Sequence, residues 1–191
     1  MDAFGRVWDL RTGRCIMFME GHLKTISSIA ISPNGYQVVT GSADHSIKVW
    51  NLRTRSCEYT IPAHNNIVSK VMFEKHSGAF LVSSSYDNSV KTWAHPSWTP
   101  IQTLQGHDNK VMCVDSTPDS SCFVTASFDR TFKIWTPQSI GQWSVLSNFL
   151  LYVKINGDQR NQWGTHEASM GFIKLPESHV CHGSLVGLIP S

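Results

Sequence analysis

The chain has 191 residues, of which 41% are hydrophobic, and its formal net charge is +2 at pH 7. That hydrophobic content is sufficient for a packed core, and so small a net charge does not by itself indicate nucleic-acid binding. No stretch reaches the roughly 20 apolar residues of a membrane-spanning helix, and no charged-then-apolar signal peptide opens the chain, so we expect no membrane partner.

The first predicted element is a strand over residues 5–10. The same series of four strands then follows three times, because apolar and polar residues alternate over short runs separated by turn residues such as Pro33-Asn34-Gly35. The strand that comes directly after each Trp falls at 15–19, 57–61 and 101–104, and we assign it to the repeat after it. The others fall at 26–31, 68–73 and 111–115; at 37–40, 80–83 and 123–125; and at 46–50, 89–93 and 131–135.

Tryptophan recurs at intervals of 42, 43 and 42 residues, at Trp8, Trp50, Trp93 and Trp135. Each of the last three has an Asp six residues before it, a Ser two residues before that Asp, and a His 22 or 23 residues before that Asp. A fixed period near forty residues is typical of repeat architectures. The three sets are His22, Ser42, Asp44 and Trp50; His64, Ser85, Asp87 and Trp93; and His107, Ser127, Asp129 and Trp135.

This pattern resembles the WD40 repeat family, whose signature is Gly-His early and Trp-Asp late in a four-stranded blade. Gly precedes His22 and His107, and Trp8-Asp9 is the literal pair. The resemblance implies an all-β fold, an incomplete WD40 β-propeller of about three four-stranded blades in an open arc. It also implies that each His, Ser, Asp and Trp set forms one structural hydrogen-bond network, since a buried polar group needs a partner.

The implied organisation is a partial blade at residues 1–10, repeats at about 15–50, 57–93 and 101–135, and a non-repeat tail at 136–191. The tail lacks the Gly-His, Asp and Trp spacing. Two interpretations remain open, a segment not native to the fold and a degenerate blade. An apolar run at 145–155, followed by the turn signal Asn156-Gly157, is a candidate fourth strand for the last blade.

Two surfaces are candidates for binding. In the family, partners bind the rim that carries the Asp turns and the loops before the first strands; aromatic and Arg side chains are enriched at binding hot spots. The alternative is that the two rings there pack on neighbouring blades. A basic set in the turns after Trp8 and Trp50 lies at the opposite rim and suits phosphate, an acidic partner or plain solvation. The rim residues are Lys24, Tyr86, Lys110, Phe128 and Arg130, and the basic patch is Arg11, Arg14, Arg53 and Arg55.

We predict no enzymatic activity, no cofactor and no metal. A Ser, His and Asp set invites comparison with a catalytic triad, but the set occurs three times in register, which the repeat explains. His179, Cys181 and His182 lack the second ligand pair of a structural zinc site. The five cysteines show no paired spacing, which suits a reducing compartment.

A narrower resemblance covers residues 2–135. The run at 2–18, DAFGRVWDLRTGRCIMF, is similar to the WD-repeat splicing factors of the U4/U6 small nuclear ribonucleoprotein, as are 32–36, 59–64, 86–88, 95–98 and 129–133. The resemblance implies a non-enzymatic nuclear scaffold of pre-mRNA splicing, whose partners are proteins of the U4/U6 and tri-snRNP particles and whose contact with U4/U6 RNA is indirect. The long N-terminal region that carries much of the family's binding does not precede these repeats, so we expect no cyclophilin contact. The alternatives are a WD40 adaptor of another complex, such as ubiquitin-ligase substrate recruitment, and an inert truncated product.

Overall fold

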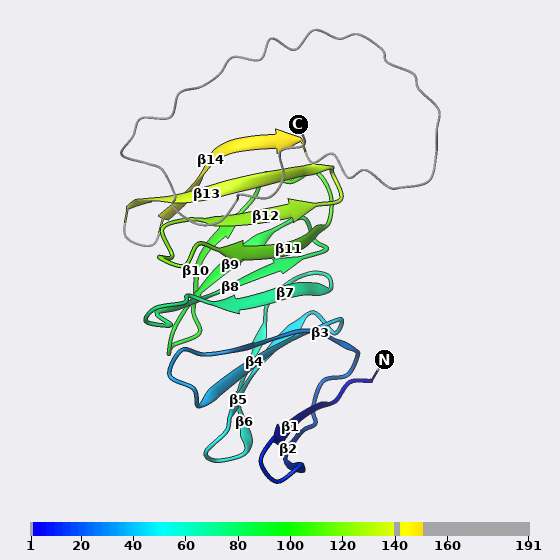
Figure 1. Ribbon diagram of the computed structural model, residues 1–191. Coiled ribbons are helices and arrows are strands. Elements are labelled where there is room, and N and C mark those ends of the chain that lie inside the picture. The colour runs from blue at the N-terminus through cyan, green and yellow to red at the C-terminus, as the bar shows by residue number, and fades with distance from the viewer. Residues whose placement is uncertain (1, 140–141, 151–191) are drawn as a thin grey trace, which may run out of the picture. The chain divides into compact units, whose positions relative to one another are not determined.

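A computed structural model describes residues 2–139 and 142–150 of the chain, which lie within the compact unit Met1–Leu151. All regular elements of these residues are β-strands, arranged as four successive antiparallel sheets (Figure 1). Within the same residues, no helix is long and apolar enough to cross a membrane.

The first sheet has two strands, β1 (Gly5–Asp9) and β2 (Arg14–Met19). Each of the next three sheets has four strands, which neighbour one another in chain order, and we call these sheets the first, second and third blades. The first blade contains β3 (Ile26–Ile31), β4 (Gln37–Ser42), β5 (Ser46–Asn51) and β6 (Ser56–Pro62). The second contains β7 (Val68–Phe73), β8 (Phe80–Ser85), β9 (Val90–Ala94) and β10 (Pro100–Leu104). The third contains β11 (Val111–Ser116), β12 (Phe123–Ser127), β13 (Thr131–Ser139) and β14 (Gln142–Leu150).

The predicted fold class is confirmed, an all-β incomplete propeller with three four-stranded blades in an open series. Successive blades contact each other through their inner strands, because β7 packs beside both β3 and β11. Short turns join the strands of a blade, and Gly35 has a φ of 75° in the turn between β3 and β4. That conformation strains side chains other than glycine.

The strand after each Trp belongs to the blade before it, and our assignment to the following repeat was wrong. β6 pairs with β5, and β10 pairs with β9. A short connection returns the chain directly beside the strand it has just left, as in a β-hairpin. For the same reason the strand predicted at residues 5–10 is not alone, because β2 pairs with β1.

The third blade continues past the predicted repeat end at residue 135. β13 runs to Ser139, and β14 pairs along it from Leu150 opposite Thr131 to Gln142 opposite Ser139. The fourth strand therefore comes from the tail and overlaps the first six residues of the run predicted at 145–155. The turn signal at 156–157 and the possible metal ligands at 179–182 lie outside the described residues.

The core lies between blades. Val39 and Val49 of the first blade share one apolar cluster with Val71 and Leu81 of the second, and all four side chains are fully buried. Burying an aliphatic side chain of this size stabilises a fold by about 1.5–3 kcal/mol. Gly41 permits this close approach, because a Cβ atom there would lie 2.7 Å from Cγ1 of Val68.

Candidate functional site

Each blade contains one buried hydrogen-bond network. In the first blade the indole Nε1 of Trp50 donates to the hydroxyl of Thr40 at 2.8 Å, and that hydroxyl lies 2.7 Å from Nε2 of His22. The other ring nitrogen of His22, Nδ1, lies 2.8 Å from a carboxylate oxygen of Asp44. Trp donates only, so the hydroxyl gives its single proton to Nε2 and the Nδ1–H donates to the carboxylate. The arrangement therefore favours a neutral His22 as its Nδ1–H tautomer.

The same network recurs in the other two blades. Ser83 lies 2.9 Å from the Trp93 indole nitrogen and 2.8 Å from Nε2 of His64, whose Nδ1 lies 2.9 Å from Asp87. In the third blade the corresponding distances are 2.9, 2.8 and 2.7 Å, and they join Trp135, Thr125, His107 and Asp129. Threefold repetition in buried positions shows that the networks fix the blades.

The central hydroxyl is not the one expected from sequence. Ser42 lies outside the Trp-to-Asp chain: its hydroxyl donates to the carbonyl oxygen of Lys24 at 3.1 Å and accepts from the amide of Asp44 at 3.1 Å. Ser85 and Ser127 occupy equivalent positions. These serines hold the Asp turn, whereas the hydroxyl two residues earlier joins the rings. The missed signal is a Ser or Thr ten residues before each Trp, at Thr40, Ser83 and Thr125.

The turn aspartates are held ionised. Burial alone would raise the pKa of Asp44, but hydrogen bonds from Ser46, the Leu23 amide and His22 outweigh it and hold the pKa far below its usual range. Asp87 and Asp129 show the same direction for the same kinds of cause. Burial lowers the pKa of His107, against the opposing effect of Asp129.

The predicted rim residues lie at the ends of the blades that carry the Asp turns. Nζ of Lys110, in the third blade, lies 5.2 Å from the ring centroid of Tyr86, in the second. The Phe128 amide donates to the Lys110 carbonyl at 2.9 Å, yet the Phe128 side chain is 62% exposed. Tyr86 is half-buried beneath Lys110, so one ring is covered and the other faces solvent.

The other two rim residues flank this cluster along the chain. Arg130 is exposed in the third Asp turn, where its φ is 65°. Lys24 is exposed before β3 of the first blade, and its carbonyl accepts from Ser42. Tyr86, Lys110, Phe128 and Arg130 therefore form an aromatic and basic surface over the second and third blades, which we call the aromatic-basic rim.

The basic patch residues are all exposed and lie in two equivalent hairpins. Arg11 follows β1 and Arg53 follows β5, and their backbone amides donate to the side chains of Asp9 and Asn51, at 2.9 and 2.7 Å. The guanidinium of Arg53 stacks 4.4 Å from the ring centroid of Tyr36. Arg14 opens β2, and Arg55 has a φ of 54° just before β6.

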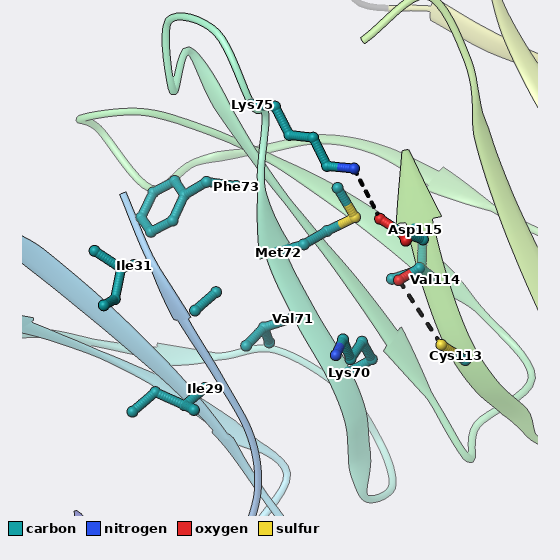
Figure 2. A pocket seen from close by; sticks show the side chains of 11 residues that line it. Ile29, Ile31, Lys70, Val71, Met72, Phe73, Lys75, Cys113, Val114 and Asp115 are labelled. Atoms are coloured by element: carbon teal, nitrogen blue, oxygen red, sulfur yellow. Dashed lines mark hydrogen bonds and ion pairs between the residues drawn. The ribbon is translucent and has the colours of Figure 1, made fainter. Parts of the chain in front are cut away.

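A hollow of about 290 Å³ lies along the inner strands β3, β7 and β11 (Figure 2). Ile29, Ile31, Val71 and Met72 supply much of its apolar lining. Its charged groups are Lys70 and an ion pair, in which Nζ of Lys75 lies 3.1 Å from Asp115. This lining offers no nucleophile paired with a base. Among the described residues, no group of three or more His, Cys, Asp or Glu side chains is placed to hold a metal ion.

Comparison with known proteins gives matches within the repeats alone. Striatin-3 of Homo sapiens is 33% identical over 85 residues, which is 44% of this chain and 11% of that protein. Striatin of Homo sapiens is 38% identical over 63 residues, 33% of this chain and 8% of that protein. Polyadenylation factor subunit 2 of Gibberella zeae is 35% identical over 79 residues, 41% of this chain and 13% of that protein. The chain thus spans about a tenth of the length of these curated relatives.

These relatives leave the narrower resemblance to U4/U6 splicing factors as a proposal. The family itself rests on a model described as "WD domain, G-beta repeat", which matches residues 13–51, 55–94 and 98–136. The matched stretches make up more than half of the chain, and each contains the His, Asp and Trp of one buried network. The chain belongs to the WD40 repeat family.

Proposed function

We propose that the chain is a non-enzymatic protein-binding scaffold of the U4/U6 small nuclear ribonucleoprotein in pre-mRNA splicing, and that it acts in the nucleus. The aromatic-basic rim carries the binding part of this proposal. Phe128 keeps 62% of its side chain exposed although its backbone is fixed by a hydrogen bond, so an apolar anchor stands in solvent on a rigid support.

The charges around this anchor favour a partner with acidic groups. Lys110 and Arg130 flank Phe128, and the two turn aspartates beneath them are occupied by hydrogen bonds within their own blades. Basic and aromatic side chains held on rigid turns bind with a small loss of conformational entropy. A protein surface with a carboxylate-rich loop and an apolar pocket would match this rim.

The assignment to splicing rests on sequence. The run at residues 2–18 and the insert at 95–98 are similar to the U4/U6 WD-repeat factors. In the structure this insert contributes to the core, because Trp98 is buried beside Phe73 with ring centroids 6.3 Å apart. A polyadenylation factor subunit among the relatives supports a role in RNA processing more broadly. A second candidate is therefore a scaffold of the polyadenylation machinery.

Capture from nuclear extract tests the proposal. The tagged full chain is used as bait, and the recovered material is read for U4 and U6 RNA, tri-snRNP proteins, polyadenylation factors and cyclophilin. We expect U4/U6 proteins and RNA above a tag-only control, with no cyclophilin. Treatment with ribonuclease should leave the protein partners bound, because we propose that RNA contact is indirect.

The other outcomes separate the candidates. Recovery of polyadenylation factors without U4/U6 proteins would replace the first candidate with the second. Recovery of U4/U6 material that is lost after ribonuclease would overturn protein-mediated binding. Soluble bait that captures neither set would overturn both assignments.

A further inference from the structure

The sheet of β1 and β2 has two strands where each of the blades has four. β1 pairs with β2 along one edge, and its other edge pairs with no strand of the described residues. In each blade the strand equivalent to β1 is paired on both edges, as β5 is with β4 and β6. An unpaired edge of this kind is a template for adding another strand.

The two-stranded sheet also carries half of a blade network. Trp8 is the counterpart of Trp50 one period earlier, and Asp2 stands six residues before Trp8, as Asp44 does before Trp50. The side chain of Trp8 is 55% exposed, whereas that of Trp50 is 2% exposed. The indole donor and the carboxylate acceptor are therefore present, while their equivalents of His22 and Thr40 would precede residue 2 in the repeat.

The neighbouring blade is exposed where such a segment would lie. Ile29 pairs with Thr40 across β3 and β4, and Val71 pairs with Ser83 in the same way one blade later. Val71 is fully buried against the blade before it, but Ile29 is 54% exposed. Ile31 is 64% exposed, and its counterpart Phe73 is 4% exposed. The apolar face of β3 thus lacks the cover that β7 has.

We propose that the free edge of β1 and the exposed face of β3 bind a two-stranded β-segment of a partner chain, which completes the blade. The partner is defined by what the repeat requires. Its second strand pairs with β1, and its first strand covers Ile29 and Ile31. It carries a His to meet Asp2 and, 18 or 19 residues later, a Ser or Thr to accept from Trp8, because these are the spacings in the three blades.

The register of the partner strand follows from the blades. The central hydroxyl residue lies opposite Lys48, Lys91 and Lys133 in turn, so the partner's hydroxyl residue pairs with Arg6. An apolar residue stands two positions before each hydroxyl and opposite the Trp, as Val38 does opposite Trp50. The same place is taken by Leu81 and Phe123 in the other blades. An apolar-x-Ser/Thr sequence in extended conformation is therefore the recognition element opposite Trp8.

The test uses the full chain and a synthetic peptide of residues 20–43, which contains His22 and Thr40 in the required spacing. Hydrogen exchange of the β1 amides is measured by mass spectrometry with and without the peptide. We expect saturable binding that slows exchange in β1 by about tenfold or more, since paired strand amides open rarely. Peptides with Thr40→Val or His22→Ala should bind about fivefold or more weakly, because each leaves a buried group unpaired.

Variants of the chain separate specific pairing from nonspecific adhesion. Trp8→Phe in the chain should weaken the native peptide and abolish the difference between it and the Thr40→Val peptide. Protection of β14 in place of β1, equal binding of all peptides, or no binding would overturn the proposal. Concentration-dependent protection of β1 without peptide would show that a second copy of the chain covers the edge, and would also overturn it. These readouts do not depend on the splicing assignment, which capture from extract tests separately.

Discussion

The hydroxyl of Thr40 lies between the Trp50 indole nitrogen, at 2.8 Å, and Nε2 of His22, at 2.7 Å. All three side chains are buried, so water cannot replace a lost partner. Thr40→Val keeps the shape and removes the hydroxyl. We expect a loss of about 1–3 kcal/mol in unfolding free energy for each group left unpaired.

Urea denaturation of the two proteins measures this loss. Thr103→Val is the matched control, because Thr103 is exposed on β10. The control should change the unfolding free energy by about 0.5 kcal/mol or less. Equal effects of the two substitutions would show that the network contributes nothing to stability.

Acid should destabilise the fold in two stages. The pKa of His107 is lowered in the folded state, so below the unfolded value near 6.5 the unfolded chain binds more protons and stability falls with pH. The depressed pKa values of Asp44, Asp87 and Asp129 act further down. Their contribution is present above the unfolded pKa of about 4 and is lost as pH falls below it.

Unfolding midpoints between pH 8 and pH 2 check this sign. We expect a shallow decline from about pH 6.5 and a steep one below about pH 4. Asp44→Asn should flatten the steep part, whereas Asp115→Asn, at an exposed carboxylate, should leave the profile nearly unchanged. A stability maximum at pH 4 would contradict the prediction.

Gly41→Ala should loosen the contact between the first and second blades. Its Cβ would lie 2.7 Å from Val68 Cγ1 and 3.0 Å from Val71 Cγ1, and both are atoms of buried, stiff side chains. We expect a cost of about 1–3 kcal/mol from overpacking. Gly5→Ala is the control, because the nearest atom there is the flexible end of Met19. Thermal unfolding should show a clear decrease for the first variant and a small one for the second.

Phe128→Ala should weaken partner capture without unfolding the chain. The ring is 62% exposed, so we expect stability to change by about 0.5 kcal/mol or less, while loss of a hot-spot anchor weakens binding by about 2 kcal/mol or more. Leu10→Ala removes another exposed apolar side chain, on the hairpin at the opposite rim. Capture that falls equally with both variants would argue against the aromatic-basic rim as the contact surface.

Periodicity was sufficient for the blades but not for the strand assignment within them. The Trp interval and the short alternating runs predicted the strands, because a repeat imposes one pattern three times. Sequence order does not show which neighbour a strand joins, so β6 was assigned to the repeat after it. Only the register of Trp50 opposite Cys57 shows that this strand closes the blade of β5.

The sites divide in the same way. His22 and Asp44 were found as members of a network because their identities repeat without change. Thr40 was missed because its counterpart in the second blade is Ser83, so the shared feature is a hydroxyl and not a residue type. The contact between Lys110 and Tyr86 joins two blades, and such neighbours follow from packing rather than from spacing.

The last strand has a different origin from its neighbours. β14 lies beyond the stretch at 98–136 that matches the family, yet it forms the outer edge of the third blade. Its backbone pairs with β13, and Trp143 anchors it on Phe123, with ring centroids 4.5 Å apart. Backbone pairing asks little of a sequence, so one aromatic anchor is enough to recruit an unrelated segment. The outer position of a blade is thus a place where new sequence enters this architecture without altering the repeat that receives it.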